Sequence, residues 1–489
     1  MIGAQCEQGG GLSQPAYQRR PDGSVDAQRR VPTAMDATKR VPPKVNIDQA
    51  PRERLELVTV VTDEGQNAIS DNKVMTMRPP ASPTRNGFLG WARSSVIAIA
   101  VALTFGLGWV AVYRAAYSPE HRSDFTVYTA AGHAALAGAD LYKAQNPRGL
   151  SYVYPPPFAI LMIPFSMLPV SWGTLAWYAL SAALTFWSLR MCVSLVQEDR
   201  QFGGDTFWLA ALAAALVLPW FIQGAAEGQA SLLMSWLMVA GLYWQANHRP
   251  ILGATCLAGA ILLKVLPAIL IAYFVWRKKW RFVAATLAMV AIGAFAPPAL
   301  VFGWNKTLTY WHEWVSVVAA PSMGNDQQHR DSPVNGQLLS PYKARSQTLQ
   351  AVCWRLTGAR HARTIAAAAA VAMLGVIGLV GWRSQPRSES LVVSAVLVWM
   401  ISAAPLSEFH YLLALLLPMM AMIFVAAHET DRATRWLARA ALAVFAVASL
   451  LTVGSPTLQQ IGLLCWAMIA LWGVLLTTVV RQTRICGSD

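Results

Sequence analysis

Long apolar runs separated by short polar connections make up most of the chain from residue 94 onward. A helix that crosses the hydrocarbon core of a bilayer needs about 20 apolar residues. The pattern predicts an all-α, polytopic membrane protein with about 12 transmembrane helices, within a range of roughly 10 to 13. The predicted spans are residues 94–116, 156–170, 172–195, 206–222, 228–246, 250–276, 281–303, 363–382, 388–404, 409–428, 434–453 and 457–480.

Two of these spans depart from a simple apolar helix. The second is short and opens with the prolines that follow Tyr154. The sixth is long and contains Lys264 and Pro267 near its middle. A proline inside a helix removes a backbone donor and bends the helix, so we expect a kink there.

A polar interruption at residues 121–157 separates the first two predicted spans. Ser123 is a favourable residue for capping a helix start, and Gly138 is a favourable residue for ending one. Apolar residues recur at helical spacing between them, namely Phe125, Tyr128, Ala131 and Ala135. We therefore predict a short amphipathic helix that lies along the outer membrane surface.

The basic connections set the predicted orientation, because Lys and Arg concentrate in cytoplasmic loops. Basic residues lie in the loops 277–281 and 383–387, in the turn 429–435 and in the tail 481–489. Twelve spans with both termini in the cytoplasm accommodate all four. The same parity places 117–155, 304–362 and the turn 405–409 outside a cell membrane, on one shared face.

Composition agrees with a membrane protein and excludes other classes. Hydrophobic residues make up 55% of the 489 residues and charged residues 13%, with 20 Trp, whereas a globular protein has about 25% charged residues. The net charge of +14 lies largely beside apolar runs, and no folded basic domain is present to bind nucleic acid. The six cysteines show no paired spacing that would indicate a disulfide framework or a zinc site.

Residues 1–93 are polar, poor in aromatic residues and without apolar periodicity. We expect a disordered cytoplasmic segment, and it lacks the arrangement of a secretory signal peptide. Because Met75 and Met77 lie just before the first span, an alternative start there would leave residues 1–74 outside the natural protein.

Within the interruption, Asp124 is the main candidate for chemistry. It is either a solvated carboxylate favoured by the helix N-terminus or a catalytic base, with Tyr128 one turn further on. Asp140 lies in a Gly-Ala-Asp sequence that is typical of a turn. Tyr154 precedes a proline and must be extended; it belongs either to the interfacial aromatic belt or to a wall that contacts a sugar or lipid headgroup.

Lys264 and His410 are the candidates in the apolar regions. A charge near the middle of an apolar span is costly and usually functional, so Lys264 should face the bundle interior and meet an anion. That anion is either Glu227 or an external phosphate group. His410 opens the tenth span at the outer face, where imidazole suits proton transfer or phosphate contact; the alternative is a structural histidine. The long loop adds Lys343, Arg345 and Arg355, with a surface helix from residue 345 onward.

Several sequence blocks in a fixed order resemble those of glycosyltransferase family 87. They run from Asp124 through Gly138-Ala-Asp140-Leu-Tyr142 to Tyr154-Pro-Pro-Pro-Phe158, then Glu227-Gly-Gln229, Leu263-Lys264-Val-Leu-Pro267 and Ser346-Gln-Thr-Leu349. The resemblance covers about residues 95–430. It implies a GT-C membrane glycosyltransferase that uses a polyprenyl-phosphate sugar, mannose or in some relatives arabinofuranose.

The resemblance also implies an organisation and a set of roles. Residues 94–303 would form a seven-helix catalytic module that includes the outer loop 117–155, followed by the long outer loop 304–362 and C-terminal transmembrane helices over 363–480. Asp124 would be the essential aspartate of the first outer loop and the general base of an inverting hexosyl transfer to a glycan or glycolipid acceptor. From its own chemistry and its place on the outer face, His410 is a second catalytic candidate. The substrate-binding candidates are Tyr128, Asp140, Tyr154, Gln229, Lys264, Lys343 and Arg355.

Two further expectations follow from the residues themselves. Many GT-C enzymes carry paired acidic residues in the first outer loop, but Asp124 lies between Ser123 and Phe125, so a divalent metal is not supported and no cofactor is expected. A multispanning transporter or a flippase of lipid-linked sugars is the main rival, because it explains the spans and Lys264 equally well. No internal repeat pairs the two halves, which favours the enzyme.

Overall fold

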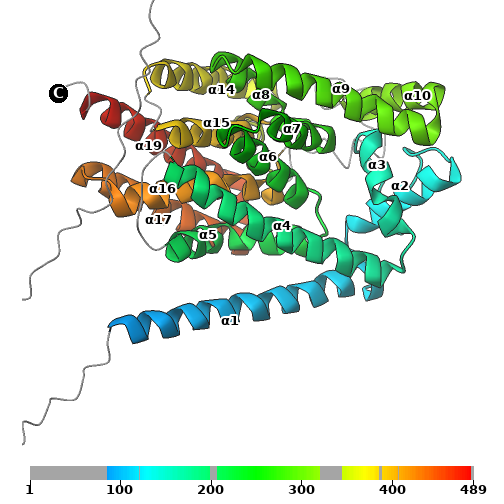
Figure 1. The fold of residues 1–489 in the computed structure, drawn as a ribbon, viewed down its shortest axis with the longest axis horizontal. Helices are drawn as coiled ribbons and strands as arrows, with labels where there is room; N and C mark the ends of the chain where they lie inside the picture. Colours follow the sequence, from blue (N-terminus) through cyan, green and yellow to red (C-terminus); the bar gives the residue numbers. More distant parts are fainter. Residues whose placement is uncertain are drawn as a thin grey trace, which may run out of the picture. The chain divides into compact units, whose positions relative to one another are not determined.

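A computed structural model describes residues 85–119, 122–198, 206–319, 344–384, 388–405 and 407–485, all within the compact unit Pro80–Asp489. The expectations for residues 1–84 and for Lys343 concern positions outside these ranges. In the described ranges the regular secondary structure is helical, apart from a single bridge between Gln145 and Ser151. Figure 1 shows most of the helices running along one common direction. The all-α fold class is confirmed.

The bounds of the helices follow the predicted spans closely. They are α1 Arg85–Val112, α2 Phe125–Ala137, α3 Pro156–Ser166, α4 Val170–Glu198, α5 Thr206–Ala226, α6 Ser231–Ala246, α7 Pro250–Leu263, α8 Ile269–Trp276, α9 Trp280–Phe302, α10 Trp304–Trp314, α13 Leu349–Thr357, α14 Ala359–Trp382, α15 Glu389–Ala403, α16 Leu416–His428, α17 Arg432–Gly454, α18 Pro456–Ile461 and α19 Leu463–Ile485. Short π-helical segments lie at η1 Tyr113–Tyr117 and η3 Val315–Ala319, and 3₁₀ segments at η2 Leu266–Ala268 and η6 Phe409–Leu415.

Eight helices in the described ranges are long and apolar enough to cross a membrane. They fall on the first, third, fourth, seventh, eighth, tenth, eleventh and twelfth predicted spans: Gly90–Tyr117, Val170–Gln197, Thr206–Ala226, Trp280–Phe302, His361–Trp382, Phe409–His428, Arg432–Gly454 and Leu463–Arg484. The other predicted spans hold shorter helices. The last span begins later than predicted, because Gly462 adopts a left-handed conformation that ends α18 and starts α19.

The expected kink in the sixth span is a complete break. Helix α7 ends at Leu263, and Lys264 has extended backbone angles of φ −147° and ψ 125°. The chain then passes through η2, which contains Pro267, before α8 begins. Pro267 has no N–H to donate to the Leu263 carbonyl, which removes one bond of the helical ladder at the break. The break therefore places Lys264 on extended backbone in the middle of an apolar region.

Helix α2 is buried on all sides over its first turns rather than on one face, so the predicted amphipathic pattern is wrong. Five consecutive residues at its start, Phe125 to Thr129, are buried. Gly132 lets α2 approach α3 closely, since a Cβ there would lie 2.9 Å from the Met162 carbonyl oxygen. Lys306 and Tyr310 of α10 donate to the carbonyls of Gly138 and Ala139 at its end. Figure 1 shows α2, α3 and α10 together at one end of the bundle.

The ends of α2 were predicted with partial success. Gly138 ends the helix with φ +64°, as expected for a left-handed cap. At the other end the cap residue is Asp124 rather than Ser123, and its side chain makes no capping hydrogen bond. The carboxylate of Asp124 is therefore available for contacts outside the helix.

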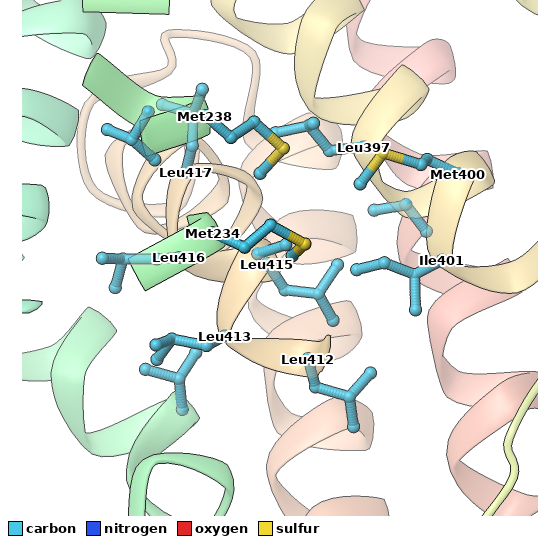
Figure 2. Close-up of a cluster of buried hydrophobic side chains, with 14 of the residues drawn as sticks. Met234, Met238, Leu397, Met400, Ile401, Leu412, Leu413, Leu415, Leu416 and Leu417 are labelled. Atoms are coloured by element: carbon cyan, nitrogen blue, oxygen red, sulfur yellow. The ribbon is translucent and has the colours of Figure 1, made fainter. Parts of the chain in front are cut away.

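Among the eight candidate spans in the described ranges, the one made of η6 and α16 is the most deeply buried. Eleven residues of α16, Leu416 to Ala426, are buried, and a helix that is apolar on every side belongs in the interior. Figure 2 shows side chains of this segment packed against two neighbouring helices: Met234 and Met238 of α6, and Leu397, Met400 and Ile401 of α15. This packing fixes η6, which carries His410 and Tyr411, in the centre of the bundle.

Candidate active site

Asp124 is held at the start of α2 by the connection between α5 and α6. Its backbone N–H donates to the carbonyl of Glu227 at 2.8 Å, and the hydroxyl of Ser123 donates to the same carbonyl at 3.3 Å. The amide of Gln229 donates to Asp124 Oδ2. Three bonds thus join the first loop to the sequence Glu227-Gly228-Gln229, and they fix both the backbone and the carboxylate of Asp124.

Gly228 makes this close approach possible. Its φ of +67° is rarely adopted by other residues. A Cβ at this position would lie 2.8 Å from the Cβ of Phe125 and 3.1 Å from the hydroxyl of Ser123. Trp177 of α4 donates to the Gly228 carbonyl at 3.0 Å and holds the turn from the other side. The glycine in the Glu-Gly-Gln block is therefore required by the contact with the helix that carries Asp124.

Lys264 points from the helix break into a cage of polar and aromatic groups. Its Nζ donates to the hydroxyl of Ser231 at 2.8 Å and lies 3.4 Å from His410 Nε2. The same atom lies 4.1 Å from the ring centre of Tyr411 and 5.5 Å from that of Tyr154. The lysine is partly exposed. An ammonium has three donors, so one N–H remains after Ser231 and His410 for an anion.

The contact with Lys264 indicates the tautomer of His410. When Lys264 is an ammonium it has donors only; His410 Nε2 is then the acceptor, and the ring proton sits on Nδ1. His410 is 6% exposed, and within the described chain its Nδ1 has no hydrogen-bond partner. The nearest carboxylate oxygen, Oε2 of Glu408, lies 3.9 Å from Nδ1. In this arrangement the imidazole orients the lysine and is not itself a cation.

Aromatic side chains line the region that contains Asp124 and Lys264. The hydroxyls of Tyr128 and Tyr154 lie 3.0 Å apart, and their rings pack edge to face at 5.1 Å. Phe158 and Trp177 continue the stack on the side of α3 and α4. Burial raises the pKa of Tyr128 and of Tyr154 well above their ordinary value, so both remain neutral hydrogen-bonding groups.

Asp124 lies in an environment that makes it more basic than an ordinary carboxylate. Burial raises the pKa of Asp124 to about 6, and the negative charges of Glu227 and Glu408 act in the same direction. The positive charges of Lys264 and Arg148 lower the pKa and offset part of that rise. A carboxylate with this pKa is ionised at neutral pH and can accept a proton, as a general base requires.

The long loop 304–362 also reaches this region. Arg345 Nη1 lies 3.3 Å from Glu227 Oε1, which also accepts from Gln223 at 3.5 Å. The backbone N–H of Gln347 donates to the Ser407 carbonyl at 3.2 Å, next to Glu408. The described end of the loop therefore contacts both the Glu227-Gly228-Gln229 sequence, which holds Asp124, and the residues just before η6.

Two of the predicted substrate-binding residues have structural partners instead. Asp140 accepts from the backbone N–H of Tyr142 at 3.0 Å and pairs with Lys143 at 3.0 Å, which is the turn that the sequence indicated. Arg355 of α13 donates to three backbone carbonyls, those of Ser346, Gln459 and Gln460. These bonds join α13 to α18, and they occupy the Arg355 guanidinium with backbone carbonyls.

Three groups in the site were not predicted as site residues. Ser231 follows the Glu-Gly-Gln block by two positions, and Glu408 and Tyr411 flank His410. An acidic residue at the end of an apolar span can indicate a functional site, because a charge there is costly. Glu408, just before the tenth span, is such a residue. Ser231 and Tyr411 carried no such signal, since serine and tyrosine are common in membrane helices and at their ends.

The residues around Asp124 do not form a metal site. In the described ranges no group of three His, Cys, Asp or Glu side chains could hold a metal ion. Glu227 and Glu408 come near Asp124 from other segments, but Glu227 is paired with Arg345. The residues present therefore do not fit a divalent cation.

Comparisons with known proteins agree with the resemblance noted in the sequence. Two curated relatives are polyprenol-phosphate-mannose-dependent alpha-(1-2)-phosphatidylinositol mannoside mannosyltransferases. The one from Mycolicibacterium smegmatis is 28% identical over 225 residues, covering 43% of this chain and 49% of the relative. The one from Mycobacterium tuberculosis is 26% identical over 223 residues, covering 42% and 51%. The chain thus spans about half the length of these relatives.

A solved structure of ArnT from Cupriavidus metallidurans bound to undecaprenyl phosphate is similar with a TM-score of 0.37 and 14% identity, over 79% of this chain and 77% of ArnT. That TM-score is too low to transfer any residue. The pattern of glycosyltransferase family 87 matches residues 152–405, just over half of the chain, and includes Glu227 and Lys264, while Asp124 precedes it and His410 follows it. The chain therefore belongs to glycosyltransferase family 87.

Proposed function

We propose that this chain transfers a hexose, mannose in the first instance, from a polyprenyl-phosphate sugar to a glycan or glycolipid acceptor. One observation carries the proposal: a base and a cation interact in one site. The base is Asp124, which is held by hydrogen bonds to Gln229 and to the Glu227 carbonyl, and the cation is Lys264, which is hydrogen-bonded to Ser231. Membership of family 87 and the printed activities of the two mycobacterial relatives support the choice of donor.

The proposed reaction is a single displacement. The acceptor hydroxyl loses its proton to the Asp124 carboxylate as its oxygen attacks the anomeric carbon of the donor sugar. The bond between that carbon and the phosphate oxygen breaks, and prenyl phosphate leaves with the electron pair. Because attack and departure occur on opposite faces, a β-linked donor gives an α-linked product.

Lys264 is proposed to stabilise the leaving group. The phosphate of the donor carries one negative charge, and the departing prenyl phosphate gains a second. A cation held in place before the reaction interacts more strongly with the transition state than with the bound donor. His410 takes part by accepting from Lys264 and so aiming its free N–H. Tyr154 and Tyr411 line the space beside that N–H.

We place this chemistry on the extracytoplasmic face of the cell membrane. The basic loops lie at the ends of the spans away from Asp124, which supports a cytoplasmic location for those loops and for both termini. Figure 1 agrees in that α2 lies at one end of the bundle and the C-terminal part of α19 at the other. A donor already in the outer leaflet needs no nucleotide-binding domain.

The direct test is sugar transfer in isolated membranes. Membranes that contain the chain, supplied with radiolabelled polyprenyl-phosphate mannose and a lipid extract as acceptor, should form a new labelled glycolipid or glycan. Membranes from the same host without the chain are the control. A rival transporter or flippase would move the donor across sealed vesicles and leave its label on prenyl phosphate, so that result would contradict the proposal.

The rate should depend on the protonation of Asp124. With a pKa of about 6, the carboxylate form predominates at pH 7 and becomes scarce below pH 5. Since only the carboxylate accepts a proton, kcat/KM should fall about tenfold for each pH unit below the pKa. The measurement is initial transfer rate against pH, after confirming that the enzyme recovers on return to pH 7. A rate that is level from pH 4 to pH 8 would contradict the base assignment.

A further inference from the structure

A large groove lies at the end of the bundle away from Asp124. It has a volume of about 1110 Å³ and is open along one side. Its walls come from three helices: Trp276 from α8, Thr483 and Arg484 from α19, and the last two turns of α14 with Arg383 at their end. Figure 1 shows the C-terminal part of α19 at the opposite end of the bundle from α2.

The part of the groove along α14 is apolar and free of side chains at two positions. A Cβ built on Gly375 or on Gly378 would have no atom within 4 Å. Leu379, Val380 and, from the facing helix, Val480 complete this surface. An open apolar surface of this kind, on helices of a membrane protein, matches the acyl chain of a lipid in shape and polarity.

The mouth of the groove is basic. Arg383 and Arg484 both line it, both are exposed, and neither guanidinium group has an interaction partner within the described chain. The neighbouring Arg277 is different, because it is bonded to Glu389 and to the Gly381 carbonyl. The two unpaired guanidinium groups are well suited to a phosphate, to which arginine can donate two parallel hydrogen bonds.

Topology alone does not account for this combination. Basic residues at the cytoplasmic ends of helices are expected in any membrane protein, but they need no groove beside them. Here two unpaired arginines stand at the mouth of an apolar groove, with Trp382 exposed at the same level, as aromatic residues are at a membrane interface. The arrangement provides separate places for a charged headgroup and for an acyl chain.

We infer that this groove binds an anionic glycerophospholipid of the surrounding bilayer. Arg383 and Arg484 contact the headgroup phosphate, and an acyl chain lies over Gly375 and Gly378. This site is separate from the proposed active site and does not depend on the proposed activity.

The test uses full-length protein and two probes, dioleoyl phosphatidylglycerol and dioleoyl phosphatidylcholine. Lipid binding is measured by native mass spectrometry of the purified protein at increasing lipid concentrations. We expect wild type to bind phosphatidylglycerol the more tightly. The double variant Arg383→Ala, Arg484→Ala should weaken that binding roughly 25-fold, about fivefold for each arginine near an anionic headgroup, with little change for phosphatidylcholine.

A second variant tests the groove without changing its charge. Gly378→Leu fills the apolar part and should weaken binding of both lipids. Its control is Gly106→Leu in α1, another helical glycine whose Cβ would have open space around it, and this variant should bind as wild type does. Retained monodispersity in size-exclusion chromatography confirms that each variant is folded.

The matched charge control is the pair Arg281→Ala, Arg432→Ala. Both residues are exposed and lie at the starts of α9 and α17, outside the groove. The inference requires this pair to keep wild-type binding. Equal losses in the two double variants would show a general surface-charge effect and overturn the site, as would equal affinity of wild type for the two lipids.

Discussion

Asp124→Asn is expected to abolish measurable sugar transfer while the protein still inserts and folds. The asparagine keeps the size of the side chain and can still accept from the Gln229 amide through its carbonyl oxygen. What it loses is the ability to take up a proton at neutral pH. Because a positioned general base contributes about 10²–10⁴-fold to a rate, the loss should lie in that range. The measurement is initial transfer rate per amount of protein in the membrane.

Asp140→Asn is the matched control for this variant. It makes the same chemical change in the same loop, but Asp140 bonds to the Tyr142 N–H and to Lys143 rather than facing the Asp124 cluster. An asparagine also favours this kind of turn, so the rate should stay within about twofold of wild type. The base assignment fails if Asp124→Asn transfers sugar at the wild-type rate, or if the two variants lose activity equally.

The helices were largely predictable because membrane spans give a strong local signal. A run of apolar residues long enough to cross a bilayer has few other structures available to it, and the observed bounds of α9 and α17 differ from the predicted ones by about two residues. The burial of α2 was not predictable in the same way. It results from contacts with α3, the next helix along the chain, and with α10, which lies far from α2 in sequence, and the residue pattern of α2 does not indicate these contacts.

The site was predictable residue by residue but not as an assembly. Lys264 stood out as a charge inside an apolar span, and Asp124 as a carboxylate in a polar interruption. Their shared surroundings depend on the turn at Gly228 and on the buried η6 segment, which bring in Ser231 and Tyr411. The predicted role of His410 as a second catalytic residue stays a prediction, although its contact with Lys264 favours an orienting role.

Lys264→Met is the second variant with a large expected effect. Methionine has a similar length and removes the charge, so the cage around position 264 keeps its shape. The lost interaction is one that strengthens as prenyl phosphate gains its second negative charge, and removing a single stabilising donor of this kind costs about 10²–10³-fold in kcat. The effect should appear mainly in kcat, with a smaller rise in the KM for the polyprenyl-phosphate sugar.

Lys143→Met and Lys264→Arg separate this role from general charge and from shape. Lys143 is 85% exposed and pairs with Asp140, so its loss should leave kcat unchanged. Arginine at position 264 restores the cation but not the compact ammonium that fits between Ser231 and His410, so it should recover part of the rate. If Lys264→Met instead raises only the KM for the acceptor, the lysine contacts the acceptor and not the leaving phosphate. If neither kcat nor KM changes, Lys264 is structural, and the charge in the helix break serves only to hold Ser231 and the neighbouring rings in place.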